Sequence, residues 1–90
     1  MRKVIVMAAV TTNTASAIQS ILGSQRENYV VHVHGTGTFT VVIEGSMDGV
    51  NFHTMASKTA SDIFNVEAAL YIRATTSGVS GASVNVWLGV

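Results

Sequence analysis

Cysteine is absent from this chain of 90 residues. Neither a disulfide nor a thiolate metal site can therefore stabilise the fold, and the composition fits a reducing compartment. The chain is long enough for one domain, and a domain of this size hides only about 60 to 65% of the surface that its unfolded form exposes. A monomer is therefore expected to have modest stability, which association with other chains would increase.

Charge is scarce as well. Five basic residues balance five acidic ones, and charged residues make up 11% of the chain while hydrophobic residues make up 48%. Without a basic surface, the chain is not expected to bind nucleic acid or an anionic membrane. A small domain has too little interior to hide so much apolar area, so part of that area is expected to lie against another protein chain.

Long apolar runs and proline are also missing. The apolar run at residues 4–10 is far too short to cross a bilayer. The β-branched residues valine, threonine and isoleucine dominate instead, and they favour strands over helices. Residues 3–10 are predicted to form a strand that is buried on both faces. Residues 16–22 fit either a helical stripe or strand alternation, and we interpret them as a strand because the surrounding sequence is all β.

From residue 29 onward, apolar and polar side chains alternate with the period of two that strands have. Polar or glycine-rich segments interrupt this alternation and predict loops at 24–28, 56–62 and 76–83, and a hairpin turn at 35–38. The residues predicted to point inward are Tyr29, Val31, Val33, Phe39, Val41, Ile43, Val50, Phe52, Leu70, Ile72, Ala74, Val84, Val86, Leu88 and Val90.

Seven or eight short strands at this spacing predict one all-β domain over residues 1–90. Its architecture is expected to be an antiparallel β-sandwich, jelly-roll-like or immunoglobulin-like, with a small barrel as the alternative. A parallel α/β fold is excluded, because no segment is long enough to supply crossover helices.

The clearest local motif is a turn formed by Gly45, Ser46, Asp48 and Gly49. Aspartate can hydrogen-bond its own backbone, and glycine adopts positive φ without steric cost, so the motif predicts a hairpin. A calcium loop would need several more oxygen ligands than Asp48 and Asn51 provide.

The stretches "GTGTFTVVIEGSMDGVNFHTM", "YIRATTSG" and "ASVNVWLGV" together resemble small β-sandwich structural proteins of tailed-bacteriophage virions. In that pattern, a strand ending in E-G-S is followed by D-G-x-x and an aromatic residue, then by a strand with an arginine and a closing V-x-V strand. The resemblance covers about residues 35–90. Here Phe52 stands where tryptophan is common.

The resemblance implies a virion protein assembled in the host cytoplasm: a head decoration (cement) protein, a head fibre base or a tail accessory protein. Such proteins act as symmetric homo-oligomers, often trimers, on the major capsid protein or other virion proteins. Residues 1–12 are a candidate oligomerisation strand that could pair with a neighbouring subunit. The candidate interface residues are Val4, Val6, Tyr71, Arg73 and Trp87.

Other chemistry has weaker support in the sequence. No nucleophile motif and no cysteine are present, so neither an enzyme nor a cofactor is expected. His32, His34 and His53 could form a three-histidine zinc site, although no acidic residue close in sequence would orient the rings.

Two aromatic residues support an alternative function. Tyr71 and Trp87 could form a stacking platform for a sugar, which would make the chain a carbohydrate- or receptor-binding module of a tail or cell-surface protein. Packing of these aromatic residues in a subunit interface is the preferred interpretation. Arg73 is expected to pair with Glu44 or Glu67.

Overall fold

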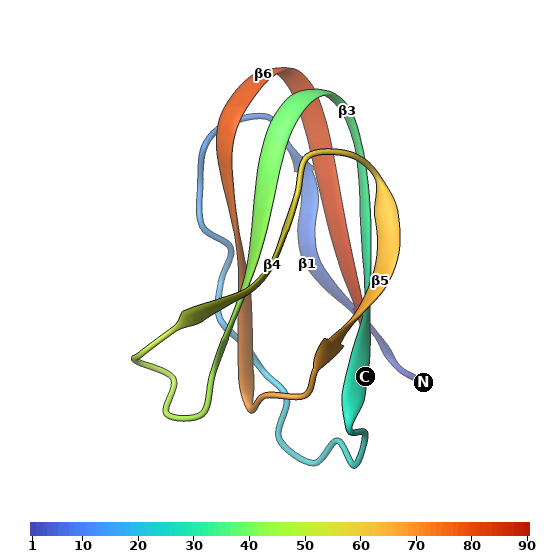
Figure 1. Cartoon of the computed structure of the whole chain (residues 1–90), viewed down its shortest axis with the longest axis vertical. Helices are drawn as coiled ribbons and strands as arrows, with labels where there is room; N and C mark the ends of the chain where they lie inside the picture. Colours follow the sequence, from blue (N-terminus) through green and yellow to red (C-terminus); the bar gives the residue numbers. More distant parts are fainter.

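The computed structural model describes all residues 1–90 and contains six antiparallel strands and no helix (Figure 1). The predicted all-β class is therefore confirmed, but the strand count is six and not seven or eight, because two strands are 19 residues long. The hydrogen-bonded order is β1-β6-β3-β4, with β2 also on β6 and β5 also on β3. The strands are β1 (Lys3–Val10), β2 (Gln19–Ser20), β3 (Asn28–Ser46), β4 (His53–Lys58), β5 (Asp62–Glu67) and β6 (Tyr71–Gly89).

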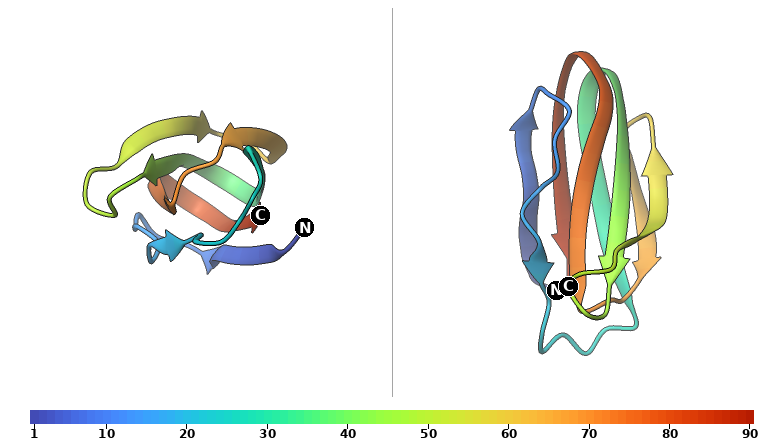
Figure 2. Two further views of the ribbon diagram at one scale, coloured as in Figure 1. Left: turned by 90° about the horizontal axis from the view of Figure 1, so that it is seen from below. Right: turned by 90° about the vertical axis from the view of Figure 1, so that its left-hand side faces the viewer.

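The long strands β3 and β6 pair with each other from one end to the other and bend together near their middles (Figure 1). The bend folds the sheet over, so that its two halves face each other as two layers (Figures 1 and 2). Layer A contains β1, β5, residues 28–36 of β3 and residues 82–89 of β6. Layer B contains β2, β4, residues 39–46 of β3 and residues 71–77 of β6.

The bend explains two wrong predictions. Residues 35–38 were expected to form a hairpin turn and residues 76–83 a loop, but both stay within their strands, with register shifts on either side of Thr38. Gly37, Gly78 and Gly81 have φ angles of 78°, 59° and 56°, which side-chain-bearing residues rarely adopt. Glycine therefore provides the curvature while the two strands remain paired across most of the bend.

The core lies between the two layers and follows the predicted alternation for most residues. Along β3 and β6 the predicted inward residues are buried; Val31, Val33, Val41, Ala74 and Val84 have no exposed surface. The exceptions lie at the ends of strands. Val50 is 79% exposed in the β3–β4 turn, Leu70 is 37% exposed, and Phe52 packs on the outer face of layer B against Arg73.

The first strand is buried on one face and not on both as predicted. Val6 and Met7 are buried in the core, whereas Ile5 is 55% exposed and Ala8 is exposed. This follows from the position of β1 at the edge of layer A, where no element covers its outer face (Figure 2). Register shifts after Ile5 and after Met7, with φ of 49° at Ala9, interrupt its pairing with β6.

Of the ambiguous segment 16–22, only Gln19 and Ser20 form the predicted strand, and the segment ends in a turn at Leu22. The chain before it also follows β6 in layer B, through an Ala15–Thr75 bridge and a 2.8 Å hydrogen bond from the Ser16 N–H to the Ala74 carbonyl. These bonds pair the edge of β6 and leave no room for a helix there.

Gly37→Ala tests the close approach at the bend. A Cβ at Gly37 would lie 2.8 Å from the Ala82 Cα and closer still to the Gly81 carbonyl oxygen, in a backbone with positive φ. We expect the free energy of unfolding, measured by urea denaturation, to fall by about 3 kcal/mol or more, because crowding adds to left-handed strain.

The matched control is Gly78→Ala, where φ is also positive but a Cβ would meet nothing within 4 Å. Its cost should be about 1 kcal/mol, from backbone strain alone. Equal losses in the two variants would contradict the close packing of the two strands at the bend.

Candidate functional site

The exposed apolar side chains are gathered in particular places. Isolated exposed apolar residues are normal on a protein, whereas groups of them indicate binding surfaces. Four large ones lie in the loops at one end of the molecule, and two more lie on the outer face of layer A. The full set is Met1, Ile5, Ile18, Leu22, Met47, Val50, Ile63 and Leu70.

The first group forms what we call the loop end: Leu22, Met47, Val50 and Leu70. They belong to the segments that follow β2, β3 and β5, which all lie at the end of the molecule opposite the bend, near both termini (Figure 1). Val50, Met47 and Leu22 are 79%, 67% and 61% exposed. None of the eight exposed large apolar residues lies in the bend itself, so the two ends of the molecule differ in how many large apolar side chains they expose.

The turn that carries Met47 and Val50 is held by Asp48. The Asp48 carboxylate accepts hydrogen bonds from the Ser46 hydroxyl at 2.8 Å and from the backbone N–H groups of Val50 at 2.9 Å and Asn51 at 2.8 Å. These bonds, that of the Asn51 N–H foremost, hold the pKa of the Asp48 carboxyl well below its usual value. The predicted hairpin is confirmed, since β3 and β4 pair on either side of the turn.

The Tyr71 ring packs close to the same turn. Gly49 has a φ of 77°, and a Cβ at this position would lie 3.4 Å from the Tyr71 ring. The four residues of the predicted motif therefore support the turn, and the exposed apolar side chains are those of Met47 and Val50. The motif was predicted from the sequence, but Met47 was not predicted to be a surface residue.

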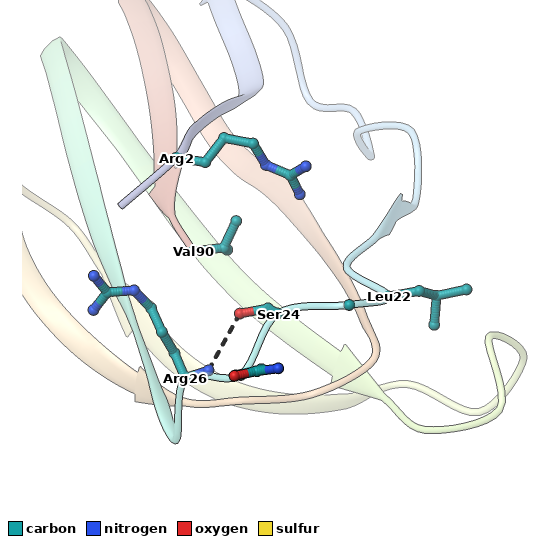
Figure 3. A pocket seen from close by; sticks show the side chains of 7 residues that line it. Arg2, Leu22, Ser24, Arg26 and Val90 are labelled. Carbon is teal, nitrogen blue, oxygen red and sulfur yellow. Dashed lines mark hydrogen bonds between the residues drawn. The ribbon is translucent and has the colours of Figure 1, made fainter.

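A pocket at the loop end adds cationic groups (Figure 3). It has a volume of about 470 Å³ and is lined by Arg2, Arg26, Ser24, Leu22 and three other residues. The ion pairs of the chain are Lys58–Asp62 and Arg73–Glu44, so both guanidinium groups at this pocket are free to bind another molecule. Guanidinium groups bind carboxylates through paired hydrogen bonds.

The second group lies on the outer face of layer A, in what we call the Trp87 row: Ile5, Trp87, His32 and Ile63. Cross-strand pairing places these four side chains side by side on β1, β6, β3 and β5. The His32 and Trp87 ring centroids are 4.9 Å apart, and His34 stacks on Trp87 at 6.3 Å with an interplanar angle of 24°. A groove of about 310 Å³ runs beside the row.

The predicted interface residues are distributed over three environments. Val6 is 8% exposed and belongs to the core, and Val4 is partly buried against it. Tyr71 and Arg73 lie in layer B, whereas Trp87 lies in layer A. Because the outer faces of the two layers point in opposite directions, Tyr71 and Trp87 cannot form the joint stacking platform that the sequence suggested (Figure 2).

Arg73 pairs with Glu44 and not with Glu67. Its Nε and Nη2 atoms donate to the two carboxylate oxygens at 3.2 and 3.4 Å, and its guanidinium lies 4.3 Å from the centre of the Phe52 ring. The Thr75 hydroxyl donates to the same carboxylate at 2.7 Å and lowers the pKa of Glu44 most, with Arg73 next. These groups satisfy one another on the outer face of layer B.

The three histidines do not come together. His32 and His34 lie on layer A, whereas His53 is paired with Gly45 on layer B. No group of three or more histidine, cysteine, aspartate or glutamate side chains in the chain could hold a metal ion. The three-histidine zinc site is therefore not formed within one subunit.

The structure also contains no helix that could span a membrane.

No protein-family model, no curated protein and no solved structure matches this chain.

The hydrogen bonds of Asp48 predict a pH-dependent stability. Its folded pKa is lowered, so the stabilisation is present above the unfolded value and is lost as pH falls through the folded one. Between about pH 4 and pH 2, the urea midpoint of the wild type should fall more steeply than that of Asp48→Asn, which has no ionising group at this position.

Glu67→Gln is the control, because no side-chain hydrogen bond or ion pair of Glu67 is present in the structure. This variant should keep the wild-type pH profile. Parallel profiles for the wild type and Asp48→Asn would show that the turn does not depend on the charged carboxylate.

Proposed function

We propose that this chain is a non-enzymatic structural protein of a tailed-phage virion, a decoration subunit that attaches to the capsid shell through its loop end. The observation that carries the proposal is the exposure of Leu22, Met47 and Val50 together at one end of a rigid domain. The likeness of residues 35–90 to virion β-sandwich proteins supports the same function.

The composition of the loop end matches that of a protein-binding surface. Interface centres are enriched in large apolar residues such as methionine and in arginine, with a polar rim around them. Here Met47 and Val50 project from a fixed turn, while Arg2 and Arg26 line the neighbouring pocket beside Leu22. A shell surface with an apolar patch and nearby carboxylates would complement this arrangement.

Attachment at many equivalent positions would compensate for the small size of each contact. The accessible surface of the subunit, 4885 Å², is close to the roughly 5,000 Å² expected for a compact monomer of 9.4 kDa. The subunit is therefore as compact as a monomer of its size. Linking several subunits into an oligomer, such as the trimer common among virion proteins, would multiply weak contacts into firm attachment.

The open side of β1 offers one route to such an oligomer. One side of this strand pairs with β6, and the other side is a free sheet edge, which can accept a strand from a neighbouring subunit. The irregular backbone after Ile5 limits regular pairing to the first part of the strand. Residues 1–12 thus belong to the domain itself and would act as a paired edge, not as a detached arm.

Met47→Asp/Val50→Asp tests the proposed attachment. Labelled protein is sedimented with undecorated heads assembled from the major shell protein of the same genome. The wild type should saturate the heads, and the double variant should bind at least about tenfold more weakly, because two carboxylates replace the apolar centre of the contact.

The matched control is Thr59→Asp/Ala60→Asp, which adds the same charge to the exposed turn between β4 and β5, near the bend (Figure 1). It should bind as the wild type does. A wild type that ignores the heads would overturn the proposal, and equal weakening by both double variants would overturn the assignment of the loop end.

A further inference from the structure

We infer that the outer face of layer A contains a carbohydrate site, in which one sugar ring stacks on Trp87 and hydrogen-bonds to His32 and His34. This site is separate from the loop end and does not depend on the proposed attachment to a shell. It differs from the platform suggested by the sequence, because Trp87 is joined by the two histidines and not by Tyr71.

The first argument is the arrangement of the rings. His32 lies directly opposite Trp87 in the β3–β6 pairing, and His34 is two residues further along the same face of β3. The His32 ring is tilted by 54° against Trp87 at 4.9 Å, and the His34 ring is stacked with Trp87 at 6.3 Å, so the three rings form an aromatic cluster whose edges carry nitrogen atoms. Such a surface suits a pyranose, whose C–H groups pack on an aromatic face while its hydroxyl groups point to the sides.

The second argument is the unused hydrogen-bonding capacity of these rings. The polar side chain next to them, Asn85, is already engaged by the Ala9 N–H at 2.9 Å and by the His34 carbonyl at 3.4 Å. By contrast, the ring nitrogens of Trp87, His32 and His34 have no partner within the chain. No buried side-chain nitrogen or oxygen lacks a partner, so these ring nitrogens face solvent. They offer donors and acceptors to a ligand hydroxyl at no cost in broken internal bonds.

The third argument is size. The groove beside Trp87 has a volume of about 310 Å³ and eight lining residues, which include Trp87 and His32 but not His34. Small-molecule sites begin at about 300 Å³, whereas a standard protein interface uses about 20 to 30 residues on each side. The groove therefore fits one or two sugar rings better than it fits a second copy of this chain.

The fourth argument is charge and rigidity. Lys3 is the one charged side chain that lines the groove. Neither a polyanion nor a cation is therefore favoured as a ligand, whereas a neutral or weakly acidic sugar fits the charge of the groove. Trp87 and His32 are paired with a neighbouring strand on both sides, which fixes their backbone, and His34 is paired with Asn85 on one side. Sites on paired strands hold their groups more closely than sites on loops do.

The test uses Trp87 as its own reporter, since it is the only tryptophan in the chain. The full-length protein is titrated with cello-, malto- and chitohexaose and with sialyllactose while tryptophan emission is recorded. At least one sugar should change the emission in a saturable way. His32→Ala and His34→Ala, measured by calorimetry with that sugar, should each weaken binding about tenfold.

His53→Ala is the matched control, because it removes the same side chain from layer B. It should bind the sugar as the wild type does, and so should Met47→Asp/Val50→Asp. Conversely, His32→Ala should still attach to heads, which separates this inference from the proposed function.

Three results would overturn the inference. The first is unchanged emission with every sugar at millimolar concentration. The second is equal weakening by His32→Ala and His53→Ala. The third is a change in emission with protein concentration alone, together with a doubled mass in light scattering, which would make the face a contact between two copies.

Discussion

The continuous pairing of β3 with β6 is the interaction on which the rest of this structure depends. The two strands stay together from Val30 opposite Gly89 to Ser46 opposite Tyr71, with interruptions only at the bend. Each remaining strand is added to one edge of this pair: β1 and β2 to β6, and β4 and β5 to β3. If the two long strands separated at the bend, both layers would lose the strands at their centre.

Folding a single ribbon over itself has a consequence for the surface. Successive side chains of a strand alternate between the two faces of its sheet, so in an unbent strand all odd-numbered side chains point to the same face. In β6 the bend sends residue 71 to the outer face of layer B and residue 87 to the outer face of layer A. One strand thereby contributes Tyr71, which supports the Asp48 turn, and Trp87, which packs against His32 in the Trp87 row, on opposite sides of the molecule.

Most of the core could be predicted from the sequence, because burial of one strand face gives apolar residues a period of two. This period can be recognised without knowing which strands pair with each other. Val31, Val41, Ala74 and Val86 are all buried as the alternation predicts. The turn at Asp48 was equally readable, because its hydrogen bonds join residues at most three positions apart. Both features depend on local sequence.

The bend could not be predicted from the sequence, and neither could the surfaces that depend on it. Glycine with positive φ serves a hairpin turn and a strand bend alike, so Gly35–Thr38 alone cannot distinguish them. The distinction depends on what lies across the pair: Gly37 approaches Gly81, which is 44 positions away in the chain. The joint Tyr71–Trp87 platform failed for this reason, since parity places both side chains outward but only the bend decides which outward face each one occupies.

The two-layer geometry assigns different residues to the stabilising core and to the exposed surfaces. Most buried residues of β3 and β6 are valine, isoleucine, alanine or leucine, and they fill the space between the layers together with Tyr29 and Phe39. Side chains at the alternate positions are free of that role, so an aromatic cluster such as His32, His34 and Trp87 can occupy them without disturbing the core. Met47 and Val50 at the loop end are independent of the core as well, because they stand on a turn whose hydrogen bonds are local. A small domain without disulfides can thus expose two separate groups of apolar and aromatic side chains, since neither group contributes the residues that hold the domain together.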